Sequence, residues 1–195
     1  MTPDYHPYYC EENIRRLCDH MQSGEACYVV FVSNTARMVA LWGQGVVHDP
    51  QDPVLWDYHV VLLHKNSSTD WVIWDLDCRA GAPLSARRWL TNSFPHTNKV
   101  RATFQPSFRL VECAEFVCTF VSDRSHMLLD DGRHTHPPPP WPAYAQSGQA
   151  SNLMRFVDME QEFVGRVVDL EGLEELLKAG ASSSDGTTPS GPVSY

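Results

Sequence analysis

The sequence contains no long hydrophobic run and few positive charges. Among its 195 residues there is no stretch of about 18 consecutive apolar residues, so we expect no membrane-spanning helix and no membrane partner. The net charge is −9 at pH 7, and the sequence has no run of basic residues longer than a pair, as in Arg15–Arg16 and Arg87–Arg88. The basic patch of a nucleic-acid-binding protein is therefore missing, and a cationic partner such as a protonated amine suits this chain better.

A secretion signal and a metal-binding cysteine pattern are also missing. The N-terminal residues MTPDYHPYY lack the basic and then apolar build of a signal peptide, so we expect the protein in the cytosol or the nucleus. In these compartments the six cysteines are expected to be free thiols, and most of them packing residues. Cys113 and Cys118 have a spacing found in some metal sites, but no second cysteine pair accompanies them. We predict no metal and no cofactor.

The chain does contain enough apolar material for one globular domain. Its hydrophobic content is 43%, which suits a folded protein of this length. We assign residues 1–180 to a single domain and residues 181–195, which have almost no core-forming side chain, to a disordered tail. Residues 122–142 are polar and include four consecutive prolines, and this length predicts a functional loop pinned to the body of the protein.

Two β-rich segments dominate the middle of the sequence. Residues 56–64 (WDYHVVLLH) and 71–77 (WVIWDLD) predict adjacent strands, and the polar gap between them predicts a hairpin. If the register places His59 opposite Asp75, their Cβ atoms lie about 5 Å apart, within reach of a hydrogen bond from the imidazole to the carboxylate. A histidine held by an acid in this way is half of a catalytic triad.

The remaining elements follow from the same local patterns. A second hairpin is predicted from residues 27–33 and 37–42, with a turn at residues 34–36. Residues 114–120 are ambiguous between helix and strand, because short apolar runs cannot be separated by periodicity alone. The other predicted elements are a helix from about Ser85, a strand at 108–112, a helix at 152–159, a strand at 164–169 and a helix at 171–180.

A helix is predicted over residues 8–21, with Cys10 at its N-terminus. Its apolar stripe consists of Ile14, Leu17, Cys18 and Met21, and Glu11 and Glu12 occupy the first turn. A helix N-terminus lowers the pKa of a thiol and surrounds it with unpaired backbone N–H groups, both of which a nucleophile needs. The alternative is a cysteine that packs as a small hydrophobic residue.

Cys10, His59 and Asp75 would supply a nucleophile, a base and an orienting acid, in the chain order used by papain-like and transglutaminase-like enzymes. That order alone is common, but the sequence words around the three residues are more specific. YCEEN, WDYHVVLLH, DLD, SDRSHM and PPPPWP occur in this order. With them, the chain closely resembles the protein N-terminal glutamine amidohydrolase family from about Tyr9 to Gly180.

The resemblance implies a monomeric α+β enzyme with a papain-like or transglutaminase-like cysteine hydrolase core, in which helices pack against an antiparallel sheet. It implies deamidation of an N-terminal glutamine of a protein to glutamate with release of ammonia, a step that feeds the arginine branch of the N-degron pathway. Position by position, the catalytic cysteine of the family falls on Cys10, its histidine on His59 and its aspartate on Asp75. The short lead before Cys10 leaves open how that edge of the cleft is covered.

Selection of a chain terminus requires groups that bind an α-ammonium, and acidic side chains are suited to this. Asp57, Asp77 and Asp123 are the candidates, because they lie within the shared sequence words. For Asp123 the alternative is a structural pair with Arg124 that ties the long loop down.

Other functions fit the same residues. A papain-like protease would cleave internal peptide bonds with this triad, and a transglutaminase would use an amine in place of water. A binding module that captures protein N-termini without turnover would use the acidic pocket alone, but it would have no need of an activated thiol.

Overall fold

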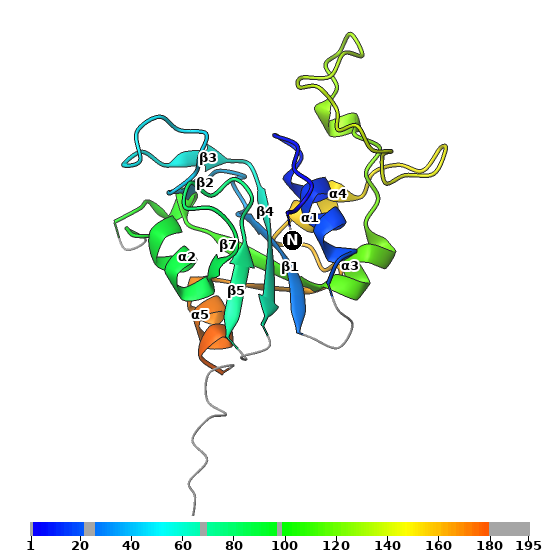
Figure 1. Ribbon diagram of the computed structural model, residues 1–195. Coiled ribbons are helices and arrows are strands. Elements are labelled where there is room, and N and C mark those ends of the chain that lie inside the picture. The colour runs from blue at the N-terminus through cyan, green and yellow to red at the C-terminus, as the bar shows by residue number, and fades with distance from the viewer. Residues whose placement is uncertain (1, 22–25, 67–69, 97–98, 180–195) are drawn as a thin grey trace, which may run out of the picture.

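A six-stranded antiparallel sheet forms the centre of the computed structural model, with the strand order β6-β5-β4-β1-β7-β8 (Figure 1). The structure describes residues 2–21, 26–66, 70–96 and 99–179, so the predicted tail lies outside the described residues. The six strands are β1 (Cys27–Ser33), β4 (His59–Lys65), β5 (Trp71–Trp74), β6 (Leu84–Ser85), β7 (Ser107–Glu112) and β8 (Arg166–Val168). Together with five α-helices in the described ranges, they confirm the α+β class.

Helices cover both faces of the sheet (Figure 1). On one face lie α1 (Cys10–Cys18), α3 (Cys113–Thr119) and α4 (Leu153–Val157), and on the other lie α2 (Ala86–Ser93) and α5 (Leu170–Ala179). Alternation along the strands explains this division, because Val29 and Phe31 of β1 pack in the first core whereas Val30 and Val32 pack in the second. Within the described ranges, every helix is too short or too polar to span a bilayer.

The predicted central hairpin is confirmed, but its register differs from the one that we considered. β4 pairs with β5 so that Leu62 lies opposite Trp74. Because β5 ends at Trp74, Asp75 lies just beyond the strand and does not oppose His59 across the ladder. The chain turns after Trp74, and this turn rather than cross-strand pairing carries Asp75 to the imidazole.

The second predicted hairpin is wrong, because both edges of β1 are occupied. β1 pairs with β4 on one side and β7 on the other, whereas β2 (Val39–Leu41) pairs with β3 (Val54–Trp56) in a separate two-stranded sheet. Asn34, directly after β1, binds the Met38 backbone and the carbonyls of Thr103 and Gln105 through its side chain. These bonds turn the chain away from the sheet.

The long loop after α3 is tied to α1 by a buried ion pair. The Arg124 guanidinium donates to both carboxylate oxygens of Glu12 at 2.8 Å, and the Trp141 indole N–H donates to Glu12 at 2.7 Å. Glu12 is fully buried, and Arg124 has the left-handed backbone angle φ 63°. Arg124 therefore does tie the loop down as predicted, but its partner is Glu12 and not Asp123. The loop contains the short 3-10 helix η2 (Ser125–Met127), and a second one, η1 (Ala102–Phe104), precedes β7.

The expectation of six free thiols is wrong for two of them. Cys27 at the start of β1 and Cys113 at the start of α3 form a disulfide, with their Cα atoms 5.5 Å apart. The fold brings these residues together from positions 86 residues apart in the chain, which no local pattern reveals. The other four cysteines are free thiols.

Candidate active site

Cys10 begins α1 and lines a cavity of about 360 Å³. Residues of β3, η2, α4 and the loops between elements complete this cavity, which we call the Cys10 cleft. Its lining consists of Tyr8, Cys10, Trp56, Asp57, Tyr58, Asp77, His126, Met127, Thr135, His136 and Met154. The predicted helix thus exists, and its first residue faces a space large enough for a side chain with the start of a peptide chain.

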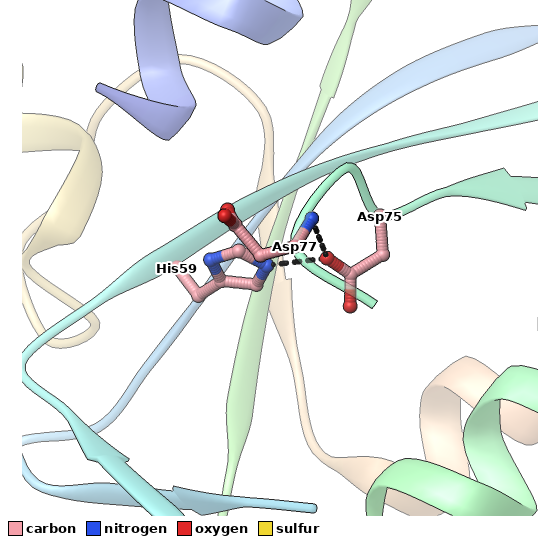
Figure 2. Close-up of side chains that lie close together, drawn as sticks. All are labelled: His59, Asp75 and Asp77. Atoms are coloured by element: carbon pink, nitrogen blue, oxygen red, sulfur yellow. Dashed lines mark hydrogen bonds and ion pairs between the residues drawn. The ribbon is translucent and has the colours of Figure 1, made fainter. Parts of the chain in front are cut away.

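His59 lies at the start of β4 and is held by Asp75 (Figure 2). The His59 Nε2 atom donates to the Asp75 Oδ1 atom at 2.8 Å, and both side chains are 1% exposed. Burial excludes water from this bond, so the carboxylate orients the ring without competition from solvent. The hydrogen bond expected from the sequence is present, although the strand register that would have explained it is not.

Asp75 is itself fixed by four donors. Its Oδ1 atom accepts from His59 and, at 3.2 Å, from the Asp77 backbone N–H. Its Oδ2 atom accepts from the Gln44 amide and from the Trp89 indole N–H, each at 2.9 Å. A buried carboxylate with all its lone pairs engaged cannot rotate freely. Residues from three different segments, namely Gln44, the turn of Asp75 and Asp77, and Trp89, thereby fix the orientation of the His59 ring.

The second ring nitrogen of His59 is left available. Because Nε2 donates to Asp75, the neutral ring has Nδ1 as its acceptor. Nδ1 is buried and has no hydrogen-bond partner among the described residues. Trp56, which also lines the cleft, stacks on the imidazole with ring centroids 5.4 Å apart. An acceptor of this kind suits the removal of a proton from a thiol.

The pKa values of the pair follow from their contact. Burial disfavours the charged form of His59, but the Asp75 carboxylate outweighs burial and raises the pKa of the imidazole. Burial likewise opposes ionisation of Asp75, yet His59 and the donors Trp89 and Gln44 lower the pKa of this carboxyl group. The two shifts agree that Asp75 carries a negative charge beside a ring that is ready to become positive.

The thiol of Cys10 differs from the expectation that the helix N-terminus lowers its pKa. Burial raises the pKa of Cys10 well above its usual value, and the carboxylates of Glu11 and Asp77 raise it further, whereas the Val60 backbone lowers it. Desolvation and the nearby carboxylates all disfavour the thiolate form. The thiol is therefore neutral at rest and needs a base at the moment of attack.

Glu11 contacts the Cys10 thiol, and sequence reasoning gave it no role beyond the first turn of the helix. Its side chain is fully buried and accepts from the Tyr58 hydroxyl at 3.1 Å and from the Cys10 thiol at 3.7 Å. Its other oxygen faces the His126 Nε2 atom at 3.4 Å. The position of Glu11 directly after the nucleophile in YCEEN was the available signal, whereas nothing in the sequence marked Gln44 or distinguished Trp89 from an ordinary core residue.

The three predicted substrate-binding acids do not lie together. Asp57 and Asp77 both line the Cys10 cleft. Asp77 also accepts a hydrogen bond from the Tyr5 hydroxyl at 2.6 Å. Asp123 is not among the residues that line this cleft, and its carboxylate caps the Ser125 backbone N–H at 2.9 Å.

One group of side chains has the donor types and spacing of a metal site. His59, Asp75 and Asp77 each offer a ligand atom, and these atoms lie within 4.8 Å of one another. However, both Asp75 oxygens already accept hydrogen bonds from protein donors, and the His59 Nε2 atom is one of these donors. A cation there would have to displace the bond between His59 and Asp75, so the donor set fits a hydrogen-bonded pair better than a ligand set.

Comparison with known proteins agrees with this geometry. The family model described as N-terminal glutamine amidase matches residues 5–177. A human protein N-terminal glutamine amidohydrolase is 36% identical over 162 residues, covering 80% of this chain and 78% of the relative. The protein of that name from Arabidopsis thaliana is 36% identical over 163 residues, 78% of this chain and 74% of the relative. That from Caenorhabditis briggsae is 35% identical over 162 residues, 82% of this chain and 86% of the relative. The chain belongs to the N-terminal glutamine amidase family.

Proposed function

We propose that this protein hydrolyses the side-chain amide of an N-terminal glutamine in proteins or peptides, giving glutamate and ammonia. The observation that carries the proposal is that Cys10 and Asp77 line one cleft while Asp77 lies within 4.8 Å of His59, whose buried pair with Asp75 leaves its second ring nitrogen without a partner among the described residues. Membership of the N-terminal glutamine amidase family supports the same reaction. The proposed catalytic domain is residues 1–180, acts as a monomer without a cofactor, and has a papain-like or transglutaminase-like core.

The first half of the reaction forms a thioester. Cys10 Sγ attacks the glutamine Cδ atom while the thiol proton moves to His59 Nδ1, which is the ring nitrogen not engaged by Asp75. The negative charge on the amide oxygen is met by backbone N–H groups at the start of α1, including that of Cys10. The carbon–nitrogen bond then breaks, and the imidazolium gives its proton to the departing ammonia.

The second half releases glutamate. Water, deprotonated by the same Nδ1 atom, attacks the thioester carbon; the carbon–sulfur bond then breaks, and the imidazolium returns the proton to the leaving thiolate of Cys10. Asp75 keeps the Nε2–H tautomer throughout and stabilises the imidazolium that forms twice in each cycle. Because the resting thiol is neutral, the transfer of its proton to His59 is part of the barrier.

The α-ammonium of the substrate is bound by acidic side chains of the cleft. We assign this role to Asp77 and Asp57, the two carboxylates that line it. For Asp123, which caps the Ser125 N–H, we favour the structural role. Asparagine is shorter than glutamine by one methylene, worth about 1–3 kcal/mol in a pocket, so its rejection rests mainly on misplacing the carboxamide from Cys10.

The product suggests a place for the reaction in the cell. A new N-terminal glutamate is a substrate for arginylation, so the enzyme would feed the arginine branch of the N-degron pathway. This role places it in the cytosol or the nucleus, with proteins that carry N-terminal glutamine as its partners.

A panel of three peptides separates this function from its rivals. We expect ammonia from a peptide that begins with glutamine, and none from the same peptide beginning with asparagine or with N-acetylated glutamine. A cysteine protease would instead release peptide fragments. A transglutaminase would need an added amine for rapid turnover, and a binding module would retain the free N-terminus and release nothing. Ammonia from the acetylated peptide at the same rate would contradict the proposal.

A further inference from the structure

The segment that precedes Cys10 is fastened along the rim of the cleft. We call residues 4–9 the N-terminal strap. The His6 N–H donates to the Asn13 side-chain oxygen, and the Asn13 amide donates back to the His6 carbonyl, both at 2.8 Å. The His6 Nε2 atom donates to the Pro137 carbonyl at 2.8 Å, and Arg16 pairs with Asp4. The strap is thus held between α1 and the proline run.

Two tyrosines of the strap reach functional groups of the site. The Tyr5 hydroxyl donates to Asp77 Oδ1 at 2.6 Å, and Tyr8 stacks on His136 with ring centroids 3.5 Å apart and planes 7° from parallel. Partial burial and the Asp77 carboxylate raise the pKa of Tyr5, so its hydroxyl stays protonated and remains a donor. Tyr8 has φ 70°, a conformation that side chains other than glycine rarely adopt. Its ring is therefore held in the cleft wall at some conformational cost.

Tyr8 of the strap, together with Trp56 and Asp77, separates two cavities of similar size. Beside the Cys10 cleft lies a second cavity of about 360 Å³. It is lined by Tyr5, Pro7, Tyr8, Gly45, Val46, Trp56, Leu76, Asp77 and Cys78. Tyr8, Trp56 and Asp77 line both cavities, so these three side chains are the partition between them. Without the partition, the two spaces would form one groove that runs past the catalytic thiol.

Asp77 occupies the catalytic end of this partition. One of its carboxylate oxygens lies within 4.8 Å of a ring nitrogen of His59. Figure 2 shows its carboxylate beside the imidazole and pointing away from Asp75. An ammonium bound at Asp77 would be separated from the amide carbon of glutamine by four bonds, which lets that carbon approach the thiol. An internal glutamine offers Asp77 only a neutral amide N–H and brings a preceding residue that needs the space of the partition.

We propose that the partition restricts the enzyme to chain termini: Tyr5 positions Asp77 for the α-ammonium, and the Tyr8–His136 stack blocks the path of any preceding residue. The proposal rests on the proposed function and assigns terminus selection to Tyr5 and Tyr8. It also answers how the edge of the cleft before Cys10 is covered, because the strap itself covers it.

Three variants test the proposed roles of Asp77 and Tyr8 in the partition and of Tyr5, which positions Asp77. Tyr5→Phe removes only the hydroxyl, and Asp77→Asn removes the charge. Tyr8→Gly removes the ring and suits the positive φ, so it is expected to fold. Tyr28→Phe is the matched control, because it loses a tyrosine hydroxyl on β1 outside both cavities. Each variant is assayed for ammonia release with a glutamine-initiated peptide, its N-acetylated form and a form with one added N-terminal alanine, alongside thermal unfolding.

The expected results differ between the variants. Tyr5→Phe raises KM for the free glutamine peptide roughly 3- to 10-fold with kcat nearly unchanged, the size of one hydrogen bond to a charged group. Asp77→Asn raises this KM further, by about 10-fold or more, because it removes the charge that binds the ammonium. Tyr8→Gly turns over the acetylated and alanine-extended peptides, which lowers the preference for the free terminus by about 10-fold or more.

The results also separate this proposal from the proposed function. If the parent enzyme is active and all three variants keep its KM and its preference for the free terminus, terminus selection does not lie in the partition. If the parent releases no ammonia from any of the peptides, the proposed function fails and this proposal fails with it.

Discussion

The buried pair of Arg124 and Glu12 gives the sharpest stability prediction. Replacing Arg124 with Met keeps much of the side-chain volume but leaves the Glu12 carboxylate, which is 0% exposed, with Trp141 as its remaining side-chain donor. Breaking a buried pair from one side costs about 3–5 kcal/mol, because an uncompensated charge stays buried. For a protein of this size each kcal/mol lowers Tm by about 2–4 °C, so Arg124→Met should lower Tm by roughly 6–20 °C.

Chemical denaturation of a four-member cycle is the assay. Arg124→Met, Glu12→Gln and the double variant are compared with the parent in urea, and the double variant should recover part of the loss, because no charge is then left buried alone. Lys178→Met, which removes an exposed pair with Glu174, is the control and should change the free energy of unfolding by less than about 0.5 kcal/mol. A loss below about 1 kcal/mol for Arg124→Met, or strictly additive effects, would refute the reasoning.

Three further predictions concern the catalytic pair and one structural cation. Asp75→Asn should lower kcat by about 10²- to 10⁴-fold. The reaction needs the neutral His59 ring, and the Asp75 carboxylate raises the pKa of that ring. In a pH–rate profile the rate should therefore decline on the acid side at a pH higher than the usual imidazole pKa. Asp75→Asn should move this acid limb to lower pH. Trp89→Phe removes one donor to Asp75, worth about 1.5–3 kcal/mol for a charged acceptor, and should lower kcat/KM about 10- to 100-fold in an ammonia assay. Arg109→Met deprives four backbone carbonyls between residues 156 and 164 of their donor, and should destabilise the protein by about 2 kcal/mol or more in urea.

Each of these has a contrary outcome. An acid limb that stays in place in Asp75→Asn would mean that the limb does not report His59. Full activity in Trp89→Phe would show that the other donors suffice to hold Asp75. Unchanged stability of Arg109→Met would indicate that solvent can satisfy the carbonyls that Arg109 now binds.

Local periodicity was enough to locate the elements that carry the site. The helix that begins at Cys10 and the hairpin of β4 and β5 each depend on residues close together in the chain, so the apolar pattern and turn residues identify both. The resemblance of the sequence words to a known family is likewise confirmed by the match over residues 5–177.

Features made by distant segments could not be read in this way. The strand at residues 39–41 pairs with residues 54–56 because β1 has no free edge, which is a property of the whole sheet. Gln44 and Trp89 meet at Asp75 only after folding, and the disulfide of Cys27 and Cys113 joins elements that no spacing relates. The raised pKa of Cys10 was missed in part for the same reason, because burial and the distant carboxylate of Asp77 act on the thiol only after folding.

The most direct test of the central claim is ammonia release from a glutamine-initiated peptide by the parent protein and by Cys10→Ala, with both shown to unfold at the same temperature. We expect steady turnover by the parent, with glutamate as the new first residue, and no release above background by the variant. Equal release by the two proteins would contradict the assignment of Cys10 as the nucleophile and with it the proposed mechanism.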